Sequence, residues 1–240
     1  MIRFDRHLTM NADAQVAPVA ALVADPTRAT ILFALSDGRA LPACDLALHA
    51  GVTAATISYQ LEKLIGGGLV AADRHGRHRY YRLANPTVIG LLEALATVAP
   101  PAPARTFREG QEGKALRLAR TCYDHLAGQL GVRIAEALLA GGCLAADGPS
   151  ARDYVLTPAG ERLFRRLAVD VAGARAARRA FARACLDWSE RRHHLAGALG
   201  AALLDRLFEL GWIERTPSSR AVRLSDLGRR GLRAHFQIEI

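Results

Sequence analysis

Apolar side chains recur with the 3.6-residue period of a helix over most of the first hundred positions. Residues 14–24 are mostly apolar, and Asp25-Pro26 then supplies a helix cap and a proline at the first helical position. The helix that follows carries three apolar residues on one face before a glycine ends it: Ile31, Leu32 and Leu35. A second short helix, ACDLALHA, is expected between Pro42 and Gly51.

The stretch GVTAATISYQLEKLIGGGLV, residues 51–70, predicts a helix with sharp ends. Thr53 caps its start, and three glycines stop it before a strand. Its inward face is apolar and consists of Ile57, Leu61, Leu64 and Ile65. Its outward face carries small polar and aromatic side chains instead, namely Thr53, Thr56, Ser58, Tyr59, Gln60 and Lys63.

Residues 69–73 and 79–83 predict two strands, and the glycine-containing segment between them predicts a hairpin. The tip of this hairpin is basic and holds Arg74, His75, Arg77, His78 and Arg79. A last apolar helix is expected over 87–98, after Asn85-Pro86. This order of elements is that of a winged helix-turn-helix. We expect the capped helix to reach base edges in the major groove and the tip to contact the DNA backbone or minor groove.

The second half of the chain contains an internal repeat. Residues 124–144 match residues 193–213 at an offset of 69, and the match continues at an offset of 68 between 154–160 and 222–228. Each copy predicts a helix that ends in glycine, a short hairpin and a capped helix. A long arginine-rich helix, residues 160–184, is expected to join the copies.

Three prolines and two glycines interrupt the periodic pattern between residues 98 and 113. We therefore expect a DNA-binding and dimerisation domain over 1–98, a linker over 99–113 and a C-terminal sensor or dimer-control domain over 114–240. The predicted fold class is mainly α with small β-hairpins. It combines an N-terminal winged helix-turn-helix with a C-terminal helical domain of two degenerate helix-hairpin-helix, winged-helix-like repeats.

The charge balance favours a polyanionic partner. The chain of 240 residues has 32 lysines and arginines against 23 acids, which gives a formal net charge of +9 and a pI near 10.1. Four cysteines without a Cys-x-x-Cys pair favour reduced thiols in a cytosol and argue against a zinc knuckle. No run approaches the roughly 20 apolar residues that cross a bilayer, so we expect a cytoplasmic protein without membrane contact.

Residues 16–98 resemble the ArsR-type bacterial repressors. The resemblance rests on DPTRATILFAL, on ACDLALHAGVTAATISYQLEKLIGGGLV and on RHGRHRYYRL, in this order. It implies a homodimer that binds a palindromic operator on double-stranded DNA and releases it when an inducer binds. It also implies dimer contacts through APVAALVA and TVIGLLEALATV. One departure is Gln60, where the family commonly has histidine; glutamine can still pair bidentately with adenine.

The departures at the family's metal-binding positions are larger. Arsenic and antimony sensors of the family carry a Cys-x-Cys-Asp-Leu box, and this chain has Pro42 where the first of those cysteines would stand. Cys44 alone cannot build a three-sulfur site, and we expect it to be a buried small residue. The family's other site uses Asp and His on the last helix of the domain, where this chain offers only Glu93. The sequence therefore predicts neither usual metal site and no definite cofactor.

The second half resembles the C-terminal extension of a subgroup of these regulators, through RTCYDHLAG and CLDWSERRHHLAG. Thiols, carboxylates, imidazoles and an indole concentrate there, and pseudo-symmetric packing of the copies would bring them together. The candidate residues for an unknown small-molecule effector are Cys122, Tyr123, Asp124, His125, Cys185, Asp187, Trp188, Arg191 and His193. Two alternatives stay open: a metal site from Cys122, Cys185, His125 and His193, or a purely architectural role in which Asp124 and Asp187 cap helices.

Three functions of different class are consistent with these patterns. The first is a homodimeric repressor. The second is a non-specific architectural nucleic-acid binder, which would show no preference for any site. The third is an enzyme with Cys122 or Cys185 as nucleophile, but no phosphate loop, nucleophile elbow or zinc-protease motif accompanies these cysteines. We therefore expect a regulator without catalytic residues.

Overall fold

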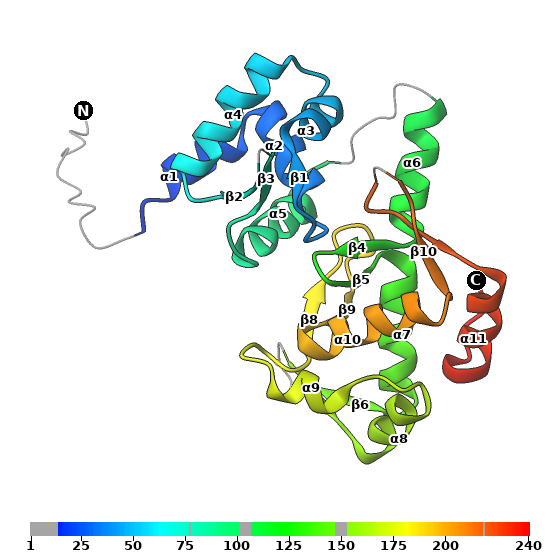
Figure 1. Cartoon of the computed structure of the whole chain (residues 1–240). Coiled ribbons are helices and arrows are strands. Elements are labelled where there is room, and N and C mark those ends of the chain that lie inside the picture. The colour runs from blue at the N-terminus through cyan, green and yellow to red at the C-terminus, as the bar shows by residue number, and fades with distance from the viewer. Residues whose placement is uncertain (1–13, 77, 101–106, 147–152, 218) are drawn as a thin grey trace, which may run out of the picture.

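The computed structural model describes residues 14–76, 78–100, 107–146, 153–217 and 219–240. Figure 1 shows an N-terminal unit of helices around a small sheet, and a second unit of helices and short hairpins. No single helix in these ranges is long and apolar enough to cross a membrane, although the bent pair α1 (Val16–Val23) and α2 (Pro26–Ala34) meets the length and composition criteria together.

The N-terminal unit has the winged helix-turn-helix order of elements. The side chain of Asp25 caps α2 by accepting from the backbone N–H of Arg28 at 2.9 Å, and that of Thr53 caps α4 by accepting from the N–H of Thr56 at 3.3 Å. Gly51 ends α3 with a φ of +63°, a conformation that favours glycine. After α1 and α2 the elements are β1 (Leu41–Pro42), α3 (Ala43–Ala50), α4 (Ala54–Gly66), β2 (Val70–His75), β3 (His78–Leu83) and α5 (Thr87–Val98).

Strands β1, β3 and β2 form one antiparallel sheet in that order. The β2–β3 hairpin pairs Val70 with Leu83 at its base and His75 with His78 at its tip. The helices cover this sheet with an apolar core to which α2, α3, α4 and α5 contribute, including Ile31, Leu46 and Leu92. The predicted helix-turn-helix and wing are confirmed for this unit. The expectation that Cys44 is buried is wrong: it is exposed, because the inward face of α3 is the one that carries Leu46.

The second unit contains two stretches with the same order of elements. Each stretch begins with a short hairpin, continues with a helix and a second hairpin, and ends with a capped helix. The first comprises β4 (Arg120–Cys122), β5 (His125–Ala127), α7 (Gly128–Ala140), β6 (Leu144–Ala146), β7 (Tyr154–Leu156) and α8 (Pro158–Arg166). The second comprises β8 (Arg183–Leu186), β9 (His193–Ala196), α10 (Gly197–Glu209), β10 (Ile213–Arg215), β11 (Val222–Leu224) and α11 (Asp226–Phe236).

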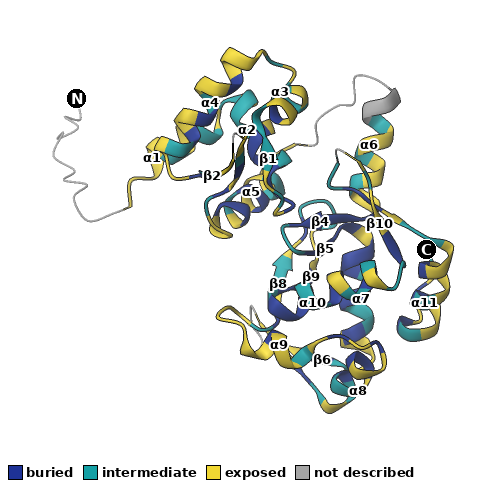
Figure 2. Cartoon of the chain, viewed as in Figure 1, coloured by how far each residue is buried: buried dark blue, intermediate teal, exposed yellow. Residues whose placement is uncertain are grey.

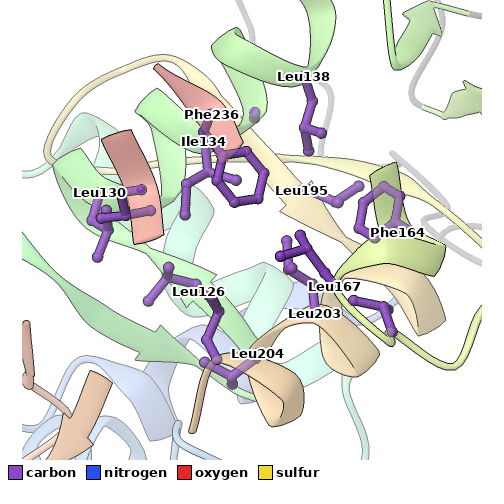
Figure 3. Close-up of a cluster of buried hydrophobic side chains, with 14 of the residues drawn as sticks. Leu126, Leu130, Ile134, Leu138, Phe164, Leu167, Leu195, Leu203, Leu204 and Phe236 are labelled. Carbon is purple, nitrogen blue, oxygen red and sulfur yellow. The ribbon is translucent and has the colours of Figure 1, made fainter. Parts of the chain in front are cut away.

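Apolar side chains from both stretches meet in one core, shown in Figure 3. Leu130 and Ile134 of α7 lie in this core together with Leu203 and Leu204 of α10, and Phe236 of α11 closes one side. Helix α7 packs against β9, and α10 packs against β5. Each long helix thus contacts the first hairpin of the other stretch, which places the hairpins β4–β5 and β8–β9 next to each other.

Two expectations for the second half are wrong. The segment 160–184 is not one long helix, because α8 ends at Arg166, Ala168 adopts a φ of +55° and Asp170 caps a separate helix, α9 (Val171–Ala176). Helix α6 (Phe107–Leu118) begins inside the segment predicted as linker. Helix α6 contains Gly110 and Gly113, and each glycine in a helix costs about 1 kcal/mol. The packing of α6 on α7, β4 and β11 offsets this cost.

The two units contact each other through the β4–β5 hairpin. The backbone N–H of Tyr123, in the turn of this hairpin, donates to the carbonyl of Ser36 at 2.7 Å. Cys122 and Ala127 belong to the apolar cluster of the N-terminal unit. A second contact joins the guanidinium of Arg220, in the second unit, to the ring of Phe33 in α2, with 5.7 Å between the guanidinium and the ring centre. The second unit is therefore packed against the N-terminal unit beside α2.

Gly131 and Gly200 occupy equivalent positions in α7 and α10, and each allows a close helix–hairpin contact. A Cβ atom at Gly131 would lie 2.4 Å from the carbonyl oxygen of Leu126, and one at Gly200 would lie 2.6 Å from that of Leu195. We expect Gly131→Ala and Gly200→Ala each to lower the free energy of unfolding by about 1–3 kcal/mol, the usual cost of overpacking. Urea denaturation measures this change.

Gly66→Ala is the matched control, because no heavy atom lies within 4 Å of the added methyl group. Alanine is favoured over glycine in a helix by up to about 1 kcal/mol, so this variant should be neutral or slightly stabilised. Equal stability of all three variants would contradict the close contact between the helices and the hairpins.

Candidate functional site

Helix α4 presents a polar face to solvent along the outer edge of the N-terminal unit (Figure 2). Its opposite face is held in the core by Ile57, Leu61 and Leu64. Five of the six residues predicted to contact DNA here are exposed, and Gln60 is half-buried. The exposed five are Thr53, Thr56, Ser58, Tyr59 and Lys63.

The exposed residues of α4 differ in how freely they can reach a partner. The Ser58 hydroxyl donates to the carbonyl of Ala54 at 2.9 Å, and the Thr53 hydroxyl lies 3.0 Å from that of Thr56 at the helix start. The Tyr59 side chain is 56% exposed, and the Lys63 ammonium lies 5.2 Å from its ring centre. Tyr59 and Lys63 therefore extend furthest from the helix, while the hydroxyls stay near its backbone.

Gln60 is tied to Arg28 of α2. Its side-chain oxygen accepts from Arg28 Nη1 at 2.9 Å, and the same guanidinium donates to the carbonyls of Leu22 and Ala21 at 2.7 and 3.0 Å. A bidentate contact with adenine uses both the oxygen and the amide N–H group of glutamine. Arg28 engages one of the two lone pairs of this oxygen and fixes the orientation of the amide, so a bidentate contact with adenine must share the oxygen with Arg28 or displace it.

The tip of the β2–β3 hairpin is basic and exposed. Arg74 lies opposite Arg79 across the hairpin, and His75 lies opposite His78. Arg77 lies outside the described residues. Asp73, an acidic residue of this hairpin, forms an ion pair at 2.7 Å with Arg82 on the stem. Its carboxylate is therefore directed to the stem and not to the arginines of the tip. Helix α4 contacts strand β2, so the exposed polar helix face and the basic hairpin belong to one unit, as in winged helices that bind DNA.

Comparison with known proteins places this arrangement in a family. Residues 25–72 match the family model described as "Bacterial regulatory protein, arsR family". The HTH-type transcriptional regulator YdfF of Bacillus subtilis (strain 168) is 43% identical over 225 residues, which are 94% of this chain and 98% of YdfF. This chain is an ArsR-family HTH-type transcriptional regulator. It binds DNA, as that family does.

Two further relatives of this regulator match the N-terminal unit alone. The HTH-type transcriptional regulator CmtR of Mycobacterium tuberculosis (strain ATCC 25618 / H37Rv) is 40% identical over 86 residues, which are 36% of this chain and 72% of CmtR. The solved homodimeric winged helix-turn-helix domain of Mb0332 from Mycobacterium bovis is 31% identical and covers 37% of this chain and 89% of its own, with a TM-score of 0.33.

Most of the residues predicted to bind an effector in the regulator lie in or beside two places. The first is a buried group that we call the cysteine–histidine cluster, consisting of Cys122, His125, Cys185 and His194. Hairpin β4–β5 supplies Cys122 and His125 as a cross-strand pair, and hairpin β8–β9 supplies Cys185 and His194 in the same way. The potential ligand atoms of all four lie within 4.8 Å of one another, and the Nε2 atoms of the two histidines are 3.1 Å apart.

A carboxylate lies behind each imidazole of this cluster. Asp124 Oδ1 is 3.3 Å from His125 Nδ1, and Asp187 Oδ2 is 3.3 Å from His194 Nδ1. Asp187 is fully buried, and its Oδ2 also accepts from the backbone N–H of Gly128 at 2.7 Å and from Arg120 at 3.0 Å. The two carboxylates orient both imidazoles so that Nε2 faces the centre of the cluster.

Charge and burial shift the pKa values around the cluster. Burial opposes the charged form of Asp187, but the adjacent His194 imidazole and the Arg120 guanidinium outweigh it and hold the pKa of this carboxyl well below its usual range. Burial likewise opposes protonation of His194, and Asp187 reverses this and raises the pKa of the imidazole. The neighbouring Cys185 side chain, together with burial, raises the pKa of Cys122 to about 12, so the thiol of Cys122 stays protonated at neutral pH.

The second place is a cavity of about 680 Å³ between the two units of the regulator. Trp188 and Arg191 line it, together with Phe33 and Leu92 of the N-terminal unit and Arg220. Its walls are mainly apolar, with arginines at several points. Of the other predicted residues, Tyr123 lies in the β4–β5 turn with a φ of +60°, and Asp124 pairs with Arg179.

The imidazole that joins the cluster is that of His194, not that of His193 named in the sequence-derived set. His193 is exposed, because adjacent residues of a strand point to opposite faces. The 69-residue offset of the repeat already relates His125 to His194. Sequence reasoning also missed Arg120, the buried partner of Asp187, and it missed that Glu93 lies beside the cluster, 3.6 Å from the sulfur of Cys122.

Proposed function

We propose that this regulator is a homodimeric repressor that binds a palindromic operator with α4 and the β2–β3 wing and is released by an effector. The exposed polar face of α4 and the exposed basic tip of the hairpin support DNA recognition by these two elements. The proposed DNA contacts are Thr53, Thr56, Ser58, Tyr59, Gln60, Lys63, Arg74, His75, Arg77, His78 and Arg79. Half-sites in such a complex lie about one helical turn apart.

Apolar side chains on α1 and α5 support the homodimer. None of the eight residues of α1, VAPVAALV, is buried, and Val16 is 67% exposed. On α5, Val98 is 80% exposed and Leu95 is partly exposed. Large exposed apolar groups on two helices are typical of a surface that a partner covers, and a second copy of this chain would cover them by the symmetric contact of a two-fold dimer.

We also propose that residues 114–240 form a sensor or dimer-control domain built from two degenerate repeats, after the DNA-binding and dimerisation domain over 1–98. The matched order of elements in the two stretches and their equivalent caps, Thr157 and Ser225, support the duplication. Contacts of the β4–β5 hairpin with α2 and α5 support a route from this domain to the dimer contact. Changes at the buried cluster can thereby reach α5.

The different roles proposed for α4 and the wing predict two different losses of DNA affinity. Arg79→Ala removes a charge at the wing tip and should weaken binding to all duplexes alike, with a salt slope lower by about 1. Tyr59→Ala removes a side chain of the recognition helix and should cost about 1–3 kcal/mol at particular base pairs only. The measurement is a binding titration against the DNA upstream of the gene, at several salt concentrations, with random duplex as competitor.

Arg166→Ala is the control for charge, because this exposed arginine ends α8 in the second unit. It should leave both the affinity and the salt slope unchanged. Equal behaviour of Arg79→Ala and Tyr59→Ala on all sequences would contradict the proposed roles. Binding of the unmodified chain without site preference would favour the architectural alternative.

A further inference from the structure

The cysteine–histidine cluster combines the donor atoms that a tetrahedral transition-metal ion requires. Structural and regulatory zinc sites take four ligands from thiolates and imidazoles, with metal–sulfur distances near 2.3 Å and metal–nitrogen distances of about 2.0–2.1 Å. Such distances separate neighbouring ligand atoms by roughly 3.3–3.8 Å. The four ligand atoms of the cluster lie within 4.8 Å of one another, and the two Nε2 atoms are 3.1 Å apart. Small side-chain movements therefore suffice to bring all four to one ion.

The surroundings of the cluster are those of a built site. Three of its four side chains are buried and the fourth, Cys185, is half-buried. Each imidazole has a carboxylate on its Nδ1 side, at 3.3 Å in both cases. Such carboxylate–histidine pairs fix the ring orientation of metal ligands and raise their basicity. A packed apolar core would need neither the carboxylates nor two imidazoles facing each other.

We propose that the cysteine–histidine cluster binds one divalent ion of the Zn²⁺ class in a tetrahedral Cys₂His₂ site. Two sulfur and two nitrogen donors suit a borderline-soft ion and disfavour Mg²⁺ and Ca²⁺, which prefer oxygen ligands. Both thiols bind as thiolates, so their protons leave when the ion enters. The ion then replaces the direct contact between the two imidazoles.

The position of Cys122 connects this site to the DNA-binding unit, and this second part of the proposal rests on the repressor function proposed above. The thiol of Cys122 donates to Glu93 Oε1 at 3.6 Å, and Glu93 is a buried residue of α5. A metal-bound thiolate has no proton to donate, so this bond is lost when the ion binds. Since α5 belongs to the proposed dimer contact, metal loading changes the affinity of the dimer for its operator.

Co²⁺ titration of the full, reduced chain tests the site directly, without DNA. We expect one Co²⁺ per chain, with the intense visible absorption of a tetrahedral centre and a thiolate-to-cobalt charge-transfer band, both abolished by added Zn²⁺. His194→Gln and Cys185→Ser should each weaken binding about 100-fold or more, since even residues behind the ligands contribute 10–100-fold. An absent or octahedral spectrum would overturn the proposal.

Matched controls use neighbouring residues of the same kind. His193→Gln changes the exposed histidine beside His194, and Cys143→Ser changes a cysteine outside the cluster. Both should leave the Co²⁺ spectrum and affinity unchanged, and loss of the spectrum in either would place the ligands elsewhere. Circular dichroism checks that each variant is folded; Cys185→Ser keeps the test valid if His194→Gln unfolds, because its half-buried side chain is the least enclosed of the four.

A second titration tests regulation. The affinity for DNA upstream of the gene is measured with Zn²⁺ and with a chelator, and we expect a change of about 10-fold or more in the unmodified chain and none in Cys185→Ser. Metal binding without this change would overturn the regulatory part and leave a structural site. Failure to bind DNA in either state would contradict the repressor function, while the Co²⁺ spectrum would still decide whether the site exists.

Discussion

Asp187→Ala is expected to lower the free energy of unfolding by about 3–5 kcal/mol, the usual cost of leaving a buried charge without its partner. Both Asp187 and Arg120 are fully buried, and the carboxylate is 3.0 Å from the guanidinium. The same carboxylate accepts from the backbone N–H groups of Gly128, Ser189 and Glu190. Its removal therefore leaves one cation and several donors without an acceptor. Denaturation in urea, followed by circular dichroism, measures the loss.

The pH dependence of this loss has a definite sign. The pKa of Asp187 in the folded chain lies below the value of about 3.9 of an unfolded aspartate. Its contribution to stability is therefore complete above that value and disappears as the pH falls toward the folded pKa. The difference between the unmodified chain and Asp187→Ala should shrink below about pH 4. It should also fall as the pH rises above about 6.5, the usual pKa of histidine, because Asp187 raises the pKa of His194 and this contribution is lost when the imidazole deprotonates.

Asp205→Ala is the control for this prediction, because Asp205 is exposed on α10. Its effect should stay within about 0.5 kcal/mol. The double variant Arg120→Met/Asp187→Leu removes both charges and should recover part of the stability lost in the single variant, since apolar replacements of buried ion pairs are often tolerated. A small effect of Asp187→Ala would contradict the assignment of a central ion pair.

Val98→Asp is expected to convert the proposed dimer to a monomer and to lower operator affinity by about 10²–10⁴-fold, the gain that linking two binding modules gives. Val98 ends α5 and is 80% exposed in the single chain, so a carboxylate there does not disturb the fold of one chain. In the proposed dimer the same carboxylate would be buried against apolar groups of the second copy, which is costly. Sedimentation velocity and the operator titration measure the two effects.

Leu227→Asp provides the matched control for Val98→Asp. This leucine is also an exposed apolar residue of a helix, but it lies at the start of α11 in the second unit. The variant should keep the dimer and the affinity. A Val98→Asp protein that remains dimeric would move the dimer contact away from α5.

The sequence predicted the N-terminal unit well because its signals are local. Caps, glycine stops and the spacing of apolar residues bound each helix within a few positions, and the glycine between two strands indicated the wing. The environment of Gln60 could not be predicted in this way. Its hydrogen bond to Arg28 joins residues 32 positions apart, and only the packing of α2 on α4 brings them together.

The second unit was predicted less well, since its decisive contacts are between distant segments. The strands β4, β5, β8 and β9 have three or four residues each, too short for an alternating pattern to show. The arginine-rich segment had helical composition, yet Ala168 and the Asp170 cap break it. The cysteine–histidine cluster was approached through residue types, and the 69-residue offset of the repeat already related His125 to His194. The strand register was needed to show that each of these histidines pairs with a cysteine.

The cluster takes one thiol and one imidazole from each of the two similar stretches of the second unit. A chain with a single such stretch could hold only half of the group, and it would complete it only by pairing with another chain of its kind. When both stretches lie in one polypeptide, the fold sets the effective concentration of one at the other, and this concentration no longer depends on how much protein the cell contains. Each stretch can then change in sequence elsewhere, while the loss of either one removes the whole group.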